Sequence, residues 1–131
     1  MKEGNVLNST NSFTLTIDGE VYNSGEVTEM IITECVTKLI DNDIDFFILT
    51  PKIPIKESIY MQVIYDFVVE IRFESALNGT NQYSYETDSK DEIISLFLNY
   101  FNNGEIPALT EWENLSKKRS KGIFSRLFNK F

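Results

Sequence analysis

Hydrophobic and polar residues alternate at every second position in several short stretches of the chain, which predicts β-strands with one buried face. The clearest stretch is 67–74, whose odd positions are apolar and whose even positions are mostly charged. No glycine separates it from the stretch 58–65, so the two predict either a tight hairpin or one bent strand. The other strand-like stretches are 13–17, 21–22, 46–49 and 82–87.

Two longer stretches repeat apolar residues at steps of three and four, which predicts amphipathic helices. The first is 26–41, and its predicted buried face consists of Val27, Met30, Ile31, Cys35, Val36, Leu39 and Ile40. The second begins after Ser89, with Glu92 placed to complete a reciprocal capping box, and ends at Gly104. A further short helical turn is predicted around Trp112.

The elements follow the order strand, helix, run of strands, helix, which favours a two-layer α+β architecture. We expect an antiparallel sheet of four to five strands with two helices packed on one face, plus a short C-terminal amphipathic helix. The length of 131 residues suits one domain. The predicted organisation is a flexible leader at 1–11, a single α+β domain at 12–116 and a basic amphipathic tail at 117–131.

The formal net charge of −8 is divided unevenly along the chain. Six of the 12 basic residues follow Ser116 and no acidic residue does, so residues 1–116 hold the other six against all 20 acidic ones, a net charge of −14. A field of this sign repels phosphate backbones and attracts basic surfaces. We therefore expect a basic protein partner and no direct binding of nucleic acid.

The residue types that most often build catalytic and metal sites are missing or poorly placed. The chain contains no histidine, the commonest general base and transition-metal ligand. Its single cysteine, Cys35, falls on the predicted apolar face of a helix, which indicates a buried, inert thiol. The sequence also contains no glycine-rich phosphate loop. We therefore expect no cofactor, no metal and no enzymatic activity.

Three aspartates follow the first predicted helix at alternate positions. Asp41, Asp43 and Asp45 match the first three ligand positions of a calcium-binding helix-loop-helix. The sixth position, however, holds Phe46 instead of glycine, and the twelfth holds Lys52 instead of glutamate. This departure argues against calcium and indicates a solvated acidic turn.

A second group of carboxylates lies on predicted strands. Glu70 and Glu74 share the polar side of 67–74 with Arg72 between them, and Glu86 falls on the next strand. Paired carboxylates can hydrolyse a glycosidic bond across a cleft, but Arg72 would keep both carboxylates ionised. Cross-strand charge pairing is the favoured role. A pocket around Glu70 and Glu86 would favour the alternative, an enzyme that acts through them.

The C-terminal tail combines apolar residues at helical spacing with lysine and arginine between them, which predicts a basic amphipathic helix. Such a helix could contact anionic lipid, the acidic body or a groove on a partner. The candidate tail contacts are Ile123, Phe124, Leu127, Phe128 and Phe131. Membrane contact through so short a helix would be weak.

The N-terminal ten residues lack the apolar core of a signal peptide, and no apolar run reaches the roughly 18 residues of a membrane span. A single cysteine also fits a reducing compartment. We therefore expect a cytoplasmic location.

Five short stretches between 46 and 112 share a loose pattern. They are Phe47-Ile48-Leu49-Thr50-Pro51, Tyr60-Met61-Gln62, Val69-Glu70-Ile71-Arg72-Phe73, Gln82-Tyr83 and, after a helix, Glu111-Trp112-Glu113. The pattern resembles small acidic immunity proteins of bacterial polymorphic-toxin loci. This resemblance implies a compact α+β binder of a cognate toxin, without catalysis.

The charge and the resemblance together predict a protein that neutralises a toxin by binding it, with electrostatic attraction setting the association rate. The candidate contact residues are Asp41, Asp43, Asp45, Glu70, Glu74 and Glu86. The alternative is a membrane-proximal adaptor or assembly factor of a secretion system that uses residues 117–131 as its anchor.

Overall fold

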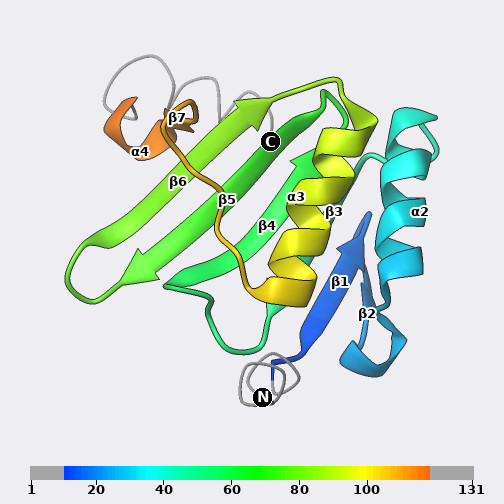
Figure 1. Cartoon of the computed structure of the whole chain (residues 1–131), viewed down its shortest axis with the longest axis horizontal. Helices are drawn as coiled ribbons and strands as arrows, with labels where there is room; N and C mark the ends of the chain where they lie inside the picture. The colour runs from blue at the N-terminus through cyan, green and yellow to red at the C-terminus, as the bar shows by residue number, and fades with distance from the viewer. Residues whose placement is uncertain (1–10, 119–131) are drawn as a thin grey trace.

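The computed structural model describes residues 11–118, which form one seven-stranded antiparallel sheet covered by helices on one side (Figure 1). The sheet has the strand order β2-β1-β3-β4-β5-β6-β7. Its strands are β1 (Phe13–Ile17), β2 (Glu20–Tyr22), β3 (Phe46–Pro51), β4 (Ser58–Ile64), β5 (Val68–Ser75), β6 (Gly79–Glu86) and β7 (Glu113–Asn114). Neighbours in the sheet are consecutive strands of the chain except for β1 and β3, between which β2 and a helix intervene, and a second helix separates β6 from β7.

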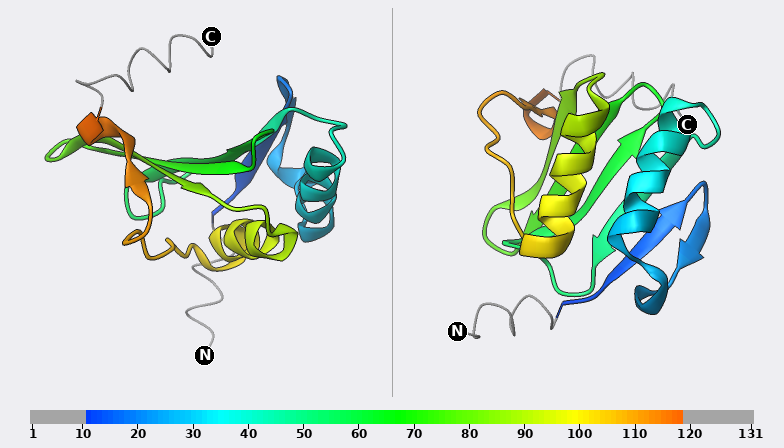
Figure 2. Two further views of the ribbon diagram at one scale, coloured as in Figure 1. Left: turned by 90° about the horizontal axis from the view of Figure 1, so that it is seen from above. Right: turned by 45° about the vertical axis from the view of Figure 1, so that its right-hand side comes forward.

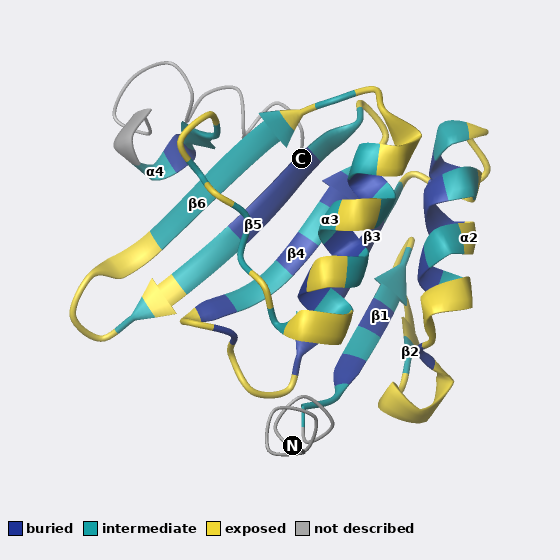
Figure 3. Cartoon of the chain, in the orientation of Figure 1, coloured by how far each residue is buried: buried dark blue, intermediate teal, exposed yellow. Residues whose placement is uncertain are grey.

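Two helices, α2 (Glu29–Ile40) and α3 (Lys90–Asn103), lie side by side on the same face of the sheet (Figure 2). Both turn their buried residues toward the strands and their exposed residues outward (Figure 3). Phe47 of β3 packs against Phe97 of α3 with ring centroids 4.8 Å apart, and neither side chain is accessible to solvent. The core therefore lies in a single layer between the helices and the sheet.

The predicted α+β class, the antiparallel sheet and the pair of helices are confirmed, but the prediction of four to five strands is wrong. The two outermost strands, β2 and β7, have only three and two residues. β2 corresponds to the strand-like stretch 21–22, with one more residue at its start. β7 was not predicted, because a two-residue strand is set by pairing with its neighbour and is too short to show a hydrophobic period.

β7 also replaces the predicted helical turn around Trp112. The Trp112 amide donates to the carbonyl of Leu109 in a turn, and the next two residues pair with β6. The ring of Trp112 stacks on that of Tyr85 at a centroid distance of 5.2 Å and an interplanar angle of 17°. This contact holds the segment against the edge strand. A four-residue helix, α4 (Leu115–Lys118), follows.

The first helix begins three residues later than predicted because Thr28 caps it, its side chain accepting a hydrogen bond from the Ile31 amide at 3.2 Å. A short 3-10 turn, η1 (Ser24–Glu26), precedes it. Met30, predicted to be buried, is 70% exposed, whereas Ile32 is fully buried. The buried set is Ile32, Cys35, Val36 and Leu39, which follows the i, i+3, i+4, i+7 spacing of a helix face.

The stretches 58–65 and 67–74 form a hairpin and not one bent strand, since Ile64 pairs with Val68. Phe67, the residue before β5, has a φ of 62° and donates its amide to the carbonyl of Ile64 at 2.7 Å. This left-handed position favours glycine. Phe67 occupies it nevertheless, and the packing of its side chain against the core offsets the cost of this conformation.

The second helix begins and ends as predicted, at Ser89 and at Gly104, which has a φ of 59°. Its capping box is only half formed. Ser89 accepts a hydrogen bond from the Glu92 amide at 3.1 Å, but the Glu92 carboxylate accepts hydrogen bonds from Thr87 and Tyr85 and leaves the Ser89 amide to Thr87. Within residues 11–118, no helix is long and apolar enough to cross a membrane.

Candidate partner-binding surface

The register of the sheet brings four turns to one end of the molecule. Ile17, Phe46, Ile64, Val68 and Glu86 lie in successive strands at this end. The segments that continue from them carry acidic side chains, and the loop from α2 to β3 lies at the same end (Figure 1). We call this surface the acidic end, and it comprises the exposed residues Asp41, Asp43, Asp45, Asp66 and Glu86.

The loop between α2 and β3 has a fixed backbone. Asn42 has a φ of 66° and donates its amide to the carbonyl of Leu39, while the Asp43 amide donates to the carbonyl of Lys38 at 2.8 Å. These two bonds and the left-handed residue form a Schellman motif, which satisfies the last carbonyls of the helix. Ile44 is buried and anchors the loop to the core.

Asp18 holds the end of this loop from the other side. Its carboxylate accepts hydrogen bonds from the backbone amides of Asp45 and Phe46 at 2.9 and 3.1 Å, and its own amide donates to the carbonyl of Phe46. Asp18 has a φ of 50°, a conformation that aspartate tolerates better than most residues. No local sequence pattern indicates this contact, because positions 18 and 45 are 27 residues apart in the chain.

Asp41, Asp43 and Asp45 present their carboxylates to solvent. Within residues 11–118, none of the three side chains takes part in an ion pair or accepts a hydrogen bond. Asp41 is the C-cap of α2 and Asp43 lies two residues further, where the helix dipole disfavours negative charge. Within the described residues, Lys38 and Lys90 also lie near this end. The five carboxylates of the acidic end outnumber these two cations.

The candidates Glu70 and Glu74 lie elsewhere, on the side of the sheet away from the helices. We call this side the open face. It carries the even-numbered residues of β3, β5 and β6 together with Tyr60, Gln62 and Ile64 of β4. Glu86 belongs to both surfaces, because it lies on the open face where β6 reaches the acidic end. The six candidate contacts therefore do not form one cluster.

A hydrogen-bonded network occupies the middle of the open face. Glu70 accepts hydrogen bonds from Gln62 at 2.6 Å and from Gln82 at 3.0 Å, and only 9% of it is exposed. Arg72 donates to Gln82 at 2.8 Å and pairs with Glu74 at 3.5 Å. The expected cross-strand charge pairing of these glutamates is thus not found within residues 11–118, because the ion pair of Arg72 is with Glu74 of its own strand. Two glutamines satisfy Glu70 instead, because they flank it on the neighbouring strands.

The remaining chemistry-bearing side chains are accounted for by packing. Cys35 is buried, as predicted, and burial raises the pKa of its thiol to about 11. Hydrogen bonds from Thr87 and then Tyr85 lower the pKa of Glu92, and the bond to Glu92 raises the pKa of Tyr85. Within residues 11–118, no three acidic or sulfur side chains are grouped so as to hold a metal ion.

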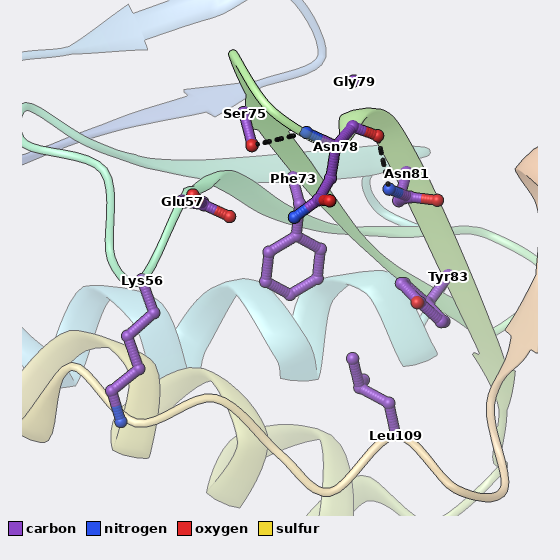
Figure 4. Close-up of a pocket in the computed structure, with 9 residues that line it drawn as sticks. All are labelled: Lys56, Glu57, Phe73, Ser75, Asn78, Gly79, Asn81, Tyr83 and Leu109. Atoms are coloured by element: carbon purple, nitrogen blue, oxygen red, sulfur yellow. Dashed lines mark hydrogen bonds between the residues drawn. The ribbon is translucent and has the colours of Figure 1, made fainter.

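A shallow pocket of about 260 Å³ lies on the helix side of the β5–β6 hairpin, away from the acidic end (Figure 4). Phe73 and Tyr83 form its floor with ring centroids 5.8 Å apart in an edge-to-face arrangement. Leu109 points into it from the segment after α3 (Figure 4). Neither Glu70 nor Glu86 lines this pocket, so it gives no support to catalysis by those carboxylates.

Comparison with known proteins gives no match to any family model, curated protein or solved structure. The resemblance to immunity proteins therefore stays a prediction. The tail candidates Ile123, Phe124, Leu127, Phe128 and Phe131 lie outside the described residues. The described residues form an acidic end in which hydrogen bonds fix the backbone of the loop between α2 and β3.

Proposed function

We propose that this chain is a non-catalytic, cytoplasmic protein-binding module that neutralises a cognate bacterial toxin by binding a basic surface through its acidic end. The contact residues are Asp41, Asp43 and Asp45, with Asp66 and Glu86 beside them. Glu70 and Glu74 are left out, because their carboxylates are engaged within the open face.

The observation that carries the proposal is the placement of Asp41 and Asp43 at the C-terminal end of α2. Negative charge there opposes the helix dipole, at about 0.3 to 1 kcal/mol for each exposed side chain. Folding gains nothing from these carboxylates, since within residues 11–118 they have no partner. Charges that weaken a fold commonly serve binding.

The rigidity of the loop supports the same use. Its backbone is fixed by the Schellman motif and by Asp18, so the carboxylates need little ordering when a partner binds. The charge of −14 on residues 1–116 extends the attraction over the whole body. A nuclease toxin is a fitting target, because its phosphate-binding cleft must be positive.

Affinity capture from the native host tests the proposal. The full chain is used as bait beside a variant in which Asp41, Asp43 and Asp45 are all replaced by asparagine. A matched control replaces Glu29, Glu34 and Glu105 by glutamine, which changes the net charge equally at exposed positions elsewhere. We expect the wild-type and control baits to enrich the same basic protein and the aspartate variant to lose it.

A growth assay then tests neutralisation. The captured protein, expressed alone, should arrest growth, and co-expression of this chain should restore it. A captured protein without toxicity would contradict the immunity role and leave only protein binding. Enrichment of the same partner by the aspartate variant would show that the acidic end is not the interface.

A further inference from the structure

The open face of the sheet is only partly polar. Phe46, Ile64 and Val68 stand opposite one another in β3, β4 and β5, and Ile48 lies in the adjoining row. All four side chains are half-buried, and both long helices pack on the opposite face (Figure 2). An apolar patch is thus left uncovered by α2 and α3, with Glu86 at the end of its row.

The described chain ends on this same side. β7 passes the outer edge of β6, and α4 lies on the open side of the sheet (Figure 2, left). The Ser116 hydroxyl accepts the backbone amide of Gln82 at 3.0 Å, which fixes the crossing point at the β6 edge. The segment that follows Lys118 therefore begins beside the open face.

The following 13 residues, 119–131, suit that face in length and chemistry. As a helix they would extend about 20 Å. The distance from β6 across to β3 is three strand spacings, or about 14 Å. The segment carries apolar residues at helical spacing and four of the chain's basic residues, and it contains no acid.

We infer that residues 119–131 dock on the open face of their own chain as an amphipathic helix that crosses from β6 to β3. The apolar side covers Phe46, Ile48, Ile64 and Val68, and the basic side chains face Glu74 and Glu86. Because the segment is tethered at Lys118, its effective concentration over the face is in the millimolar range, as for short linkers.

The charges favour this occupant over a second copy of the body. Two bodies of net charge −14 repel each other, whereas the tail brings only positive charge. The inference does not depend on the proposed function. The docked segment would engage Glu86, which the two surfaces share, but Asp41, Asp43 and Asp45 of the loop between α2 and β3 stay free.

Methyl NMR on the full chain locates the segment. Phenylalanine rings over the sheet shift nearby methyl resonances, so replacing Phe124 and Phe128 by serine should move the methyl signals of Ile48, Ile64 and Val68. The signals of Met30, exposed on α2, and of Ile53, exposed in the loop after β3, serve as the control and should not move. Unchanged open-face signals, or changes confined to the helix layer, would overturn the inference.

Hydrogen exchange of residues 123–131 gives an independent reading. Ile48→Lys places a repelling charge on the open face, and Met30→Lys makes the same chemical change on the exposed surface of α2. We expect amide exchange in this segment to be roughly tenfold faster in I48K than in the wild type, with M30K unchanged. Strand amides of β3 and β5 check that I48K stays folded.

Three results would overturn docking on the segment's own chain. Fast exchange in the wild type would show a free arm. Protection that appears only with vesicles containing phosphatidylglycerol would assign the segment to a lipid surface. Protection that rises with protein concentration would assign it to a second copy.

Discussion

The hydroxyl groups of Ser58 and Tyr100 lie 2.8 Å apart, and both residues are fully buried. Ser58 is the first residue of β4, and Tyr100 lies in the last turn of α3. The register of β4 shifts between positions 58 and 60, which turns Ser58 toward the helix. Burial raises the pKa of Tyr100 to about 12, so the phenol stays neutral over the physiological range.

Removing one partner of this pair should cost more than removing both. Ser58→Ala leaves the buried Tyr100 hydroxyl without its partner, and we expect a loss of about 1 to 3 kcal/mol in the free energy of unfolding. Tyr100→Phe added to Ser58→Ala should recover part of that loss. Urea denaturation of the two single variants and the double variant measures it. Strict additivity would show that the two hydroxyls do not interact.

Cys35 should make the protein sensitive to alkali. Its pKa is 9.0 in a solvated chain and about 11 when folded, so folding favours the neutral thiol. This stabilisation is complete below pH 9 and is lost as the pH rises toward 11. Cys35→Ala should lose less stability than the wild type over that window, as measured by urea denaturation at each pH.

The same residue tests the assignment of the buried helix face. Cys35→Ser places a hydroxyl in the core and should destabilise the fold by about 1 to 3 kcal/mol. Thr33→Ser, a change at a half-buried position on the same helix, is the control and should have a small effect. Equal melting temperatures for all three proteins would contradict the packing described for α2.

Asp18 should stabilise the acidic loop although it is exposed. Asp18→Ala removes the acceptor for two amides and places alanine at a φ of 50°, so we expect a loss of about 1 to 2 kcal/mol in the free energy of unfolding. Asp18→Asn retains an acceptor oxygen and tolerates the conformation, so it should cost less. Faster amide exchange at Asp45 and Phe46 in the alanine variant alone would locate the effect.

Neutralising Asp41 and Asp43 should stabilise the fold. Asparagine at both positions removes two charges that oppose the helix dipole, which predicts a gain of about 0.5 to 1.5 kcal/mol. Glu29→Gln is the matched control, because it removes a carboxylate from the first turn of the same helix and should destabilise instead. Thermal unfolding of both variants measures the sign. A loss of stability in the aspartate variant would remove the argument that these charges serve binding.

The sequence predicted the elements whose hydrophobic period is long enough to recognise. The face of β5 and the ends of α3 are examples, because alternation and capping residues are local signals. β7 was missed, since Glu113 and Asn114 are strand residues only through pairing with β6. The prediction that Met30 is buried was wrong, because the position of the Thr28 cap and the packing against the sheet decide which residues of α2 face inward.

The candidate site was predicted as a set of residue types but not as a surface. Asp41, Asp43 and Asp45 were found because they are close in sequence. Asp66 joins them only through the sheet register, and Asp18 reaches the loop by contacts that are distant in sequence, so no local pattern reveals either residue. Glu70 is separate from that group because it lies two residues further along β5 than Val68, the residue at the acidic end, and its carboxylate is held by Gln62 and Gln82.

Association kinetics with the captured partner test the central claim most directly. The rate constant is measured against ionic strength for the wild type, for the variant with asparagine at Asp41, Asp43 and Asp45, and for the control with glutamine at Glu29, Glu34 and Glu105. We predict roughly tenfold slower association for the aspartate variant at low salt and a flatter salt dependence, with the control close to the wild type. Equal rates and equal salt dependence for the two variants would contradict the account, because binding would then follow net charge and not the acidic end.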